Sequence, residues 1–250
     1  MERMRAVAHP GAGFSVRWIE LGGTGRPAVY LHGWGCSSAS SFADIARRAG
    51  RPAALVDLLG HGLSDRPQGF DYGLLEHADA LAAVVRTYPA GVDLIGHSLG
   101  GTLALLVADR HPDLVHRLVL IEPAIDAFPV SSSDYAARDE EGLRVDRERH
   151  DLDDQTWDRR AEMQLADPIA LRRIALSLHD ALGDTLHDVL ARPKVPTLLV
   201  LGGQRSYRAE EDFLLGGVDV HRIPQAGHFV MNEAPDEYDA VTRAFLGGRS

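Results

Sequence analysis

The chain has 250 residues, 45% apolar and 25% charged, which is typical of one globular α/β domain or of a domain with an insertion. Its formal net charge of -10 argues against nucleic acid as a partner, because binding phosphates requires a basic face. The first residues lead into no apolar leader, no apolar run could span a membrane, and the single cysteine, Cys36, excludes an intramolecular disulfide. We therefore expect a cytoplasmic protein without a membrane partner.

Strand-like and helix-like segments alternate from Val16 onward, which predicts an α/β fold with a mostly parallel, doubly wound sheet. The predicted strands are the apolar runs 16–20, 28–31, 53–57, 92–95, 118–121, 197–201 and 218–223. The predicted helices are 40–49, 74–88, 99–110 and 236–245.

The alternation stops after Pro123. Residues 126–190 contain helix-like sequence and no clear strand, so we predict a helical insertion there, within a core formed by residues 1–125 and 191–250. The insertion holds 16 Asp/Glu and 8 Arg, a formal charge of -8. We favour solvated outer helix faces as the explanation, and an acidic entrance that disfavours anionic substrates remains the alternative.

Residues 95–101, Ile-Gly-His-Ser-Leu-Gly-Gly, match the G-x-S-x-G pattern of a nucleophile elbow. This pattern holds a serine hydroxyl out on a sharp turn between a strand and a helix, where a base can reach it. Ser98 occupies that position, and Gly96 and Gly100 leave room where side chains would collide. The helix that starts at Leu99 directs its free N–H groups toward a reacting carbonyl.

A serine is a poor nucleophile unless a base lies within hydrogen-bond reach. Among the twelve histidines, His228 is the candidate base because it follows the last predicted strand. Loops at the carboxyl ends of parallel strands are where α/β folds place their chemistry. We expect His97 to pack the elbow and His61 to be a structural turn residue.

Together these segments resemble the α/β-hydrolase superfamily. The matching residues are His32-Gly33-Trp34, the segment 57–64, the elbow around Ser98, and Gly227-His228. The resemblance covers nearly the whole chain and implies an α/β-hydrolase fold in which 126–190 is a helical cap. It also implies an oxyanion hole formed by the backbone N–H groups of Trp34 and Leu99. It calls for no metal ion and no organic cofactor.

The acid that should orient the histidine departs from the common pattern of this superfamily. Many members carry an Asp shortly after the seventh strand, whereas residues 202–206 here read Gly-Gly-Gln-Arg-Ser. Glu122 ends the strand that follows the elbow, and this placement resembles haloalkane dehalogenases and pancreatic-type lipases. We favour Glu122 as the acid, with Asp126 as the alternative; a structural carboxylate at Glu122 remains open. The carboxylates at 210–212 lie on a predicted helix further from the strand end.

These residues predict a serine hydrolase that cleaves a small carboxylic ester or lactone through an acyl-enzyme intermediate. Because the nucleophile is a serine, the reactions of dehalogenases and epoxide hydrolases, which use an aspartate, are disfavoured. Thioesters and activated C–C bonds remain open as substrates. A rival class also remains open, namely a ligand receptor or a catalyst of a non-hydrolytic step such as cyclisation, and the missing standard acid is its main support.

Overall fold

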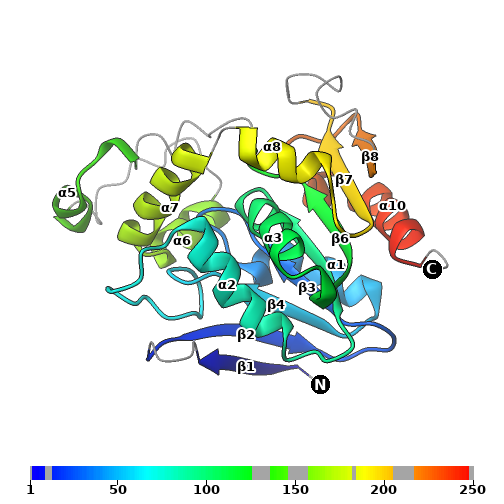
Figure 1. The fold of residues 1–250 in the computed structure, drawn as a ribbon, viewed down its shortest axis with the longest axis horizontal. Helices are drawn as coiled ribbons and strands as arrows, with labels where there is room; N and C mark the ends of the chain where they lie inside the picture. The colour runs from blue at the N-terminus through cyan, green and yellow to red at the C-terminus, as the bar shows by residue number, and fades with distance from the viewer. Residues whose placement is uncertain are drawn as a thin grey trace.

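Eight strands form one sheet in the order β1-β2-β4-β3-β5-β6-β7-β8 among the residues described by the computed structural model (Figure 1). Those residues are 2–8, 13–125, 136–145, 157–181, 184–204 and 217–247. The strands are β1 (Arg3–Ala8), β2 (Ser15–Leu21), β3 (Ala28–Leu31), β4 (Ala53–Asp57), β5 (Val92–His97), β6 (Val115–Ile121), β7 (Thr197–Gly202) and β8 (Val218–Ile223). The pairs β1–β2 and β2–β4 are antiparallel, and all other neighbours are parallel. The predicted mostly parallel, doubly wound sheet is confirmed.

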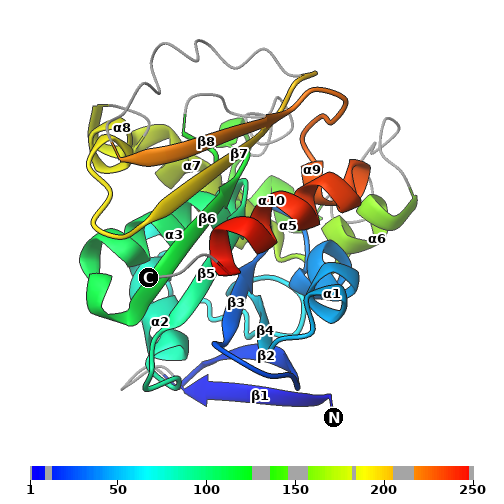
Figure 2. The same cartoon turned by 90° about the vertical axis from the view of Figure 1, so that its right-hand side faces the viewer.

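Helices cover both faces of this sheet (Figure 2). On one face lie α1 (Ser38–Ala49), α9 (Val230–Glu233) and α10 (Pro235–Gly247), and on the other lie α2 (Leu74–Val85), α3 (Leu99–Arg110) and α8 (Asp184–Ala191). A short 3-10 helix, Pro112–Leu114, precedes β6. Each face buries its own apolar cluster, with Phe42 and Tyr238 in one and Leu103 and Leu190 in the other. Burial of these two layers is the main driving force that holds the helices on the sheet.

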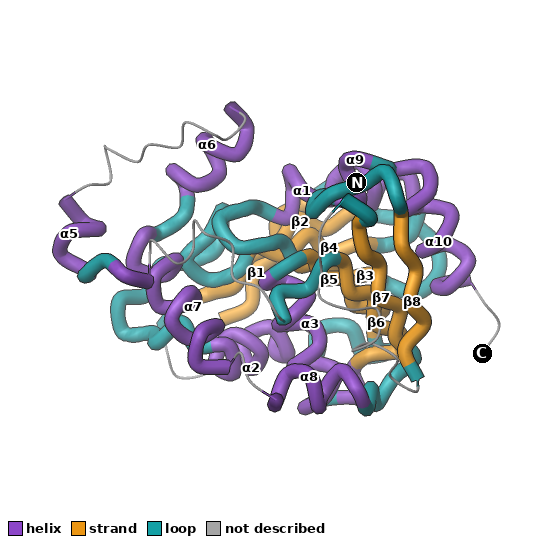
Figure 3. The backbone as a smooth tube through the Cα atoms, turned by 90° about the horizontal axis from the view of Figure 1, so that it is seen from above, coloured by secondary structure: helices purple, strands orange, loops and turns teal. Residues whose placement is uncertain are grey.

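Helices α5 (Glu140–Val145), α6 (Trp157–Leu165) and α7 (Pro168–Ala181) precede α8 between β6 and β7. Seen from above, α5, α6 and α7 lie together to one side of the strands (Figure 3). Helical sequence was expected in this stretch. The limits of the cap, residues 126–190, remain a prediction.

Three elements of the structure were not predicted, and the 3-10 helix Pro112–Leu114, with only three residues, is one of them. Strand β1 pairs along its whole length with β2, but five of its six residues are exposed, so it lacks the apolar alternation that marks a half-buried strand. Helix α9 has only four residues, too few to show a helical period. By contrast β3, β4 and β8 have the predicted bounds.

The carboxyl ends of the parallel strands all lie on the same side of the molecule. The loops that leave β3, β5, β6, β7 and β8 therefore start close to one another, and they carry every residue of the predicted site.

Candidate active site

Ser98 lies between β5 and α3 in a strained conformation, with φ 53° and ψ -120°. Its N–H donates to the Ile121 carbonyl at 2.9 Å, and its own carbonyl accepts from Thr102 N–H at 3.1 Å. A side chain at Gly96 would overlap the backbone of Gly100, so the turn leaves no space for one there. The predicted elbow geometry is therefore present, and backbone strain of this kind is common at functional sites.

Glu122 follows β6 and is fully buried beside the end of β7. Its Oε1 accepts the Gly202 N–H at 2.6 Å, so the strand end that lacks the usual acid holds this carboxylate instead. Like Ser98, Glu122 has a positive φ, 45°, and only one other non-glycine residue in the described part of the chain, Tyr72, does.

His228 lies in contact with Glu122. Its Nδ1 is 3.4 Å from Glu122 Oε2, although the two residues are 106 positions apart. An Nδ1–H that donates to this carboxylate makes Nε2 the basic nitrogen of the neutral ring. The structure thus brings together the predicted base and the favoured acid.

His228 also packs against the elbow through His97, the residue before Ser98. The His97 and His228 rings lie 4.6 Å apart between centroids, and His97 Nε2–H donates to the His228 carbonyl at 2.9 Å. On the other side, Glu233 accepts the N–H groups of both Gly227 and Phe229. These contacts hold the backbone on each side of His228.

The supporting roles of His97 and Glu233 were not predicted as such. His97 was expected only to pack, and its hydrogen bond to a loop 131 positions away follows from no local pattern. Glu233 accepts the N–H of Phe229, the N-cap residue of α9, but it lies one position beyond the glutamate of a capping box, so the sequence gives no clear signal for it.

The loop after β3 carries the predicted oxyanion donor Trp34. The Gly33 carbonyl accepts the His32 Nδ1–H at 2.7 Å and the Cys36 N–H at 3.1 Å. Because the peptide unit is planar and trans, these two bonds also fix the Trp34 N–H, which points the opposite way. Gly33 packs on the elbow so closely that a Cβ there would lie 3.3 Å from Ser98 Cβ.

Leu99, the second predicted donor, is the first residue of α3. N–H groups in the first turn of a helix have no carbonyl partner within the helix, and they lie at its positive dipole end.

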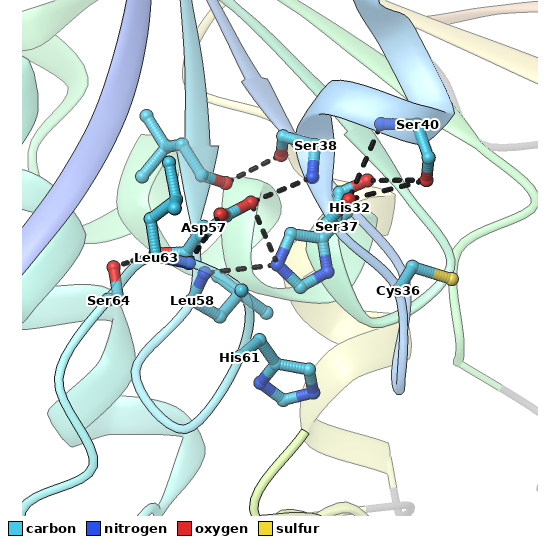
Figure 4. Close-up of polar contacts among 12 residues, drawn as sticks. His32, Cys36, Ser37, Ser38, Ser40, Asp57, Leu58, His61, Leu63 and Ser64 are labelled. Atoms are coloured by element: carbon cyan, nitrogen blue, oxygen red, sulfur yellow. Dashed lines mark hydrogen bonds and ion pairs between the residues drawn. The ribbon is translucent and has the colours of Figure 1, made fainter. Parts of the chain in front are cut away.

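Two buried histidines, His32 and His61, lie beside residues 33–37, a segment that carries the predicted oxyanion donor Trp34 and is called the oxyanion loop below (Figure 4). His32 Nε2 accepts the Leu58 N–H at 3.0 Å, and burial lowers the pKa of His32 to about 4. His61 Nε2 accepts the Gly35 N–H at 3.2 Å, and burial likewise lowers its pKa. Both rings are therefore neutral at pH 7, as these acceptor roles require. His61 has the structural role that its place in the turn predicted.

Asp57, at the end of β4, fixes the same region. Its two oxygens accept the N–H groups of Ser38 and Leu63, each at 2.9 Å, and burial raises its pKa (Figure 4). Ser38 begins α1, so this carboxylate ties the end of the oxyanion loop to the 57–64 turn. Cys36 is buried and packs in the loop, as expected.

Several predicted or alternative positions lie outside the described residues. They are Asp126, Glu210, Glu211 and Asp212. Within the described ranges, the side chains form no cluster suited to hold a metal ion. A search of the same ranges for a helix long and apolar enough to cross a membrane finds none.

Comparison with known proteins places the chain in a family. The model of the alpha/beta hydrolase family matches residues 28–241. The AB hydrolase superfamily protein YisY of Bacillus subtilis (strain 168) is 30% identical over 259 residues, covering 91% of this chain and 94% of the relative. The sn-1-specific diacylglycerol lipase ABHD11 of Danio rerio is 25% identical over 257 residues, covering 90% and 79%.

Solved structures share the fold. A mutant of the N-acyl homoserine lactonase AidH, complexed with N-hexanoyl homoserine, matches with a TM-score of 0.76 at 21% identity, covering 98% of this chain and 96% of its own. With the strand order, the elbow and the family match together, the chain belongs to the alpha/beta hydrolase family.

Proposed function

We propose that the protein is a serine hydrolase that cleaves small carboxylic esters or lactones through an acyl-enzyme intermediate. The contact between Glu122 and His228, 3.4 Å long and next to the Ser98 elbow, is the observation that carries this proposal. Relatives whose names state a lipase and an N-acyl homoserine lactonase support an ester or lactone as the bond that is cleaved.

In the proposed reaction His228 Nε2 takes the Ser98 proton as Oγ attacks the substrate carbonyl. Glu122 stabilises the imidazolium that forms and keeps the proton of the neutral ring on Nδ1. The N–H groups of Trp34 and Leu99 bind the oxyanion, and removing one donor of this kind typically costs about 3 kcal/mol of barrier. His228 then protonates the leaving alcohol, and a water activated by the same ring releases the acid and restores Ser98.

The receptor or cyclase interpretation rested on a missing acid. A buried carboxylate in contact with His228 supplies a candidate for that acid, which favours hydrolysis. Thioesters fit the same residues and belong in the substrate panel.

The test is covalent labelling by a fluorophosphonate, with hydrolysis of p-nitrophenyl esters of graded acyl length and of lactones. We expect wild type to be labelled and Ser98→Ala to lose both labelling and turnover, since loss of a triad nucleophile costs on the order of 10⁶ in kcat. Ser41→Ala removes another buried serine, on α1, and should change neither. Labelling of Ser98→Ala, or turnover above about a tenth of wild type, contradicts the proposal.

A further inference from the structure

The oxyanion loop is also held from outside, by α6 and α7. The Trp34 indole Nε1–H donates to the Leu171 carbonyl of α7 at 3.0 Å. Glu162 on α6 places Oε1 3.3 Å from both the N–H and the hydroxyl of Ser37. Thus both ends of the stretch 34–37 bond to helices that lie more than 120 positions away in the sequence.

Between these bonds, α6 packs directly on the loop backbone. Gly35 has a φ of 71°, and a Cβ there would overlap the sulfur of Met163. Met163 is itself buried, so its side chain lies against the loop rather than in solvent. The loop backbone at Gly35 is therefore in direct contact with a side chain of α6.

The inner contacts hold the loop at Gly33 and Gly35, on either side of the proposed donor Trp34. The His61 bond to Gly35 is 3.2 Å long, close to the 3.3 Å of the two Glu162 bonds. Ser37 lies two residues further on, where the loop becomes the N-cap of α1. The Glu162 carboxylate holds this end by accepting two hydrogen bonds from Ser37, one from its N–H and one from its hydroxyl.

We propose that Glu162 is a positioning residue for the oxyanion hole, which acts through Ser37 by tying α6 to the loop that presents the Trp34 N–H. This inference rests on the proposed serine-hydrolase function. It makes the segment α6–α7 part of the machinery that stabilises the oxyanion, in addition to any role as a cover of the site.

The test compares Glu162→Ala with Gln164→Ala, an exposed side chain two residues along the same helix. We expect Glu162→Ala to lower kcat about 10- to 100-fold, somewhat less than removal of a donor, with KM within about threefold. Affinity for an alkyl boronic acid, whose Ser98 adduct places an oxygen in the hole, should fall by the same factor as kcat. Glu162→Gln keeps an acceptor oxygen and should recover most of the loss, and Gln164→Ala should match wild type.

Amide hydrogen exchange over residues 32–38 supplies a measurement that does not depend on turnover. Exchange there should accelerate in Glu162→Ala and not in Gln164→Ala. Unchanged exchange overturns the proposal, even if wild type hydrolyses none of the esters. Faster exchange with unchanged kcat and boronic acid affinity in an active enzyme also overturns it, as does an equal loss in Gln164→Ala.

Discussion

The position of the Glu122 carboxylate depends on the backbone conformation of this residue. The residue leaves β6 with a positive φ, directs its carboxylate into the sheet edge, and is held there by the Gly202 N–H. A carboxylate so buried requires partners, because an unpaired buried charge is costly. His228 is one of those partners, and in the reaction proposed above its protonation gives Glu122 an opposite charge at 3.4 Å.

Glu122→Gln should lower kcat by at least about 100-fold while the protein stays folded. The amide keeps the size but removes the charge that stabilises the imidazolium, and it can favour the wrong tautomer; the corresponding Asp-to-Asn change in a serine protease costs about 10⁴. Steady-state hydrolysis of the best ester measures the effect.

The controls, each expected within a few-fold of wild type, are Asp126→Asn, Glu210→Gln, Glu211→Gln and Asp212→Asn. If Asp126→Asn abolishes activity and Glu122→Gln does not, the acid is Asp126. If none of these variants matters, Ser98 and His228 act as a dyad.

The candidate site residues and a buried ion pair lie at opposite ends of the central strands. The carboxyl ends of β5 and β6 carry Ser98 and Glu122, whereas the start of β5 carries Asp93, which is buried and paired with Arg51 and with His116. Arg51 also donates twice to the Arg26 carbonyl, so this group ties the turn before β4 to the centre of the sheet.

Asp93→Asn should therefore reduce the free energy of unfolding by about 3 kcal/mol, because it leaves a largely buried guanidinium without its counter-charge. Urea denaturation measures this. Turnover per folded molecule should stay near wild type, since the candidate site lies at the carboxyl ends of the strands and Asp93 lies near the start of β5.

The matched control is Asp79→Asn, which breaks an exposed pair with Arg110 between α2 and α3. Exposed pairs contribute about 0–1 kcal/mol, so this variant should unfold near wild type. If both variants lose the same free energy of unfolding, the buried Asp93 pair stabilises the fold no more than the exposed pair does.

In the part of the chain that the structure describes, burial of three histidines makes the free energy of unfolding depend on pH. Burial lowers the pKa of His32, His61 and His77, for His32 to about 4 from 6.5. The unfolded chain binds protons at these positions first as the pH falls. Stability is therefore full above about pH 6.5 and is lost progressively toward the folded-state pKa.

His32 by itself should account for about 3 kcal/mol of unfolding free energy lost between pH 7 and pH 4, from 1.36 kcal/mol per pKa unit. Urea unfolding at a series of pH values measures the slope. In His32→Gln the slope should be shallower than in wild type, whereas His179→Gln, on the surface of α7, should leave it unchanged. Identical slopes in all three proteins would show that His32 does not link folding to pH.

Much of the fold was readable from local sequence. The bounds of β3, β4 and β8 and the turn at Ser98 follow from apolar runs and from glycines at the elbow, because period and turn chemistry depend on neighbours a few residues apart. The exposed strand β1 carries no such pattern, so only pairing with β2 shows it.

Some features of the candidate site were also predictable from local sequence, and others were not. Ser98 and His228 stand out by motif and by their places after strands, whereas the 3.4 Å contact between Glu122 and the His228 ring is visible only in the structure. The bonds from His97 to the His228 loop and from Glu162 to Ser37 join positions 131 and 125 apart. No periodicity spans such distances, and only the closure of the chain into one sheet with its outer helices brings these groups within hydrogen-bond reach.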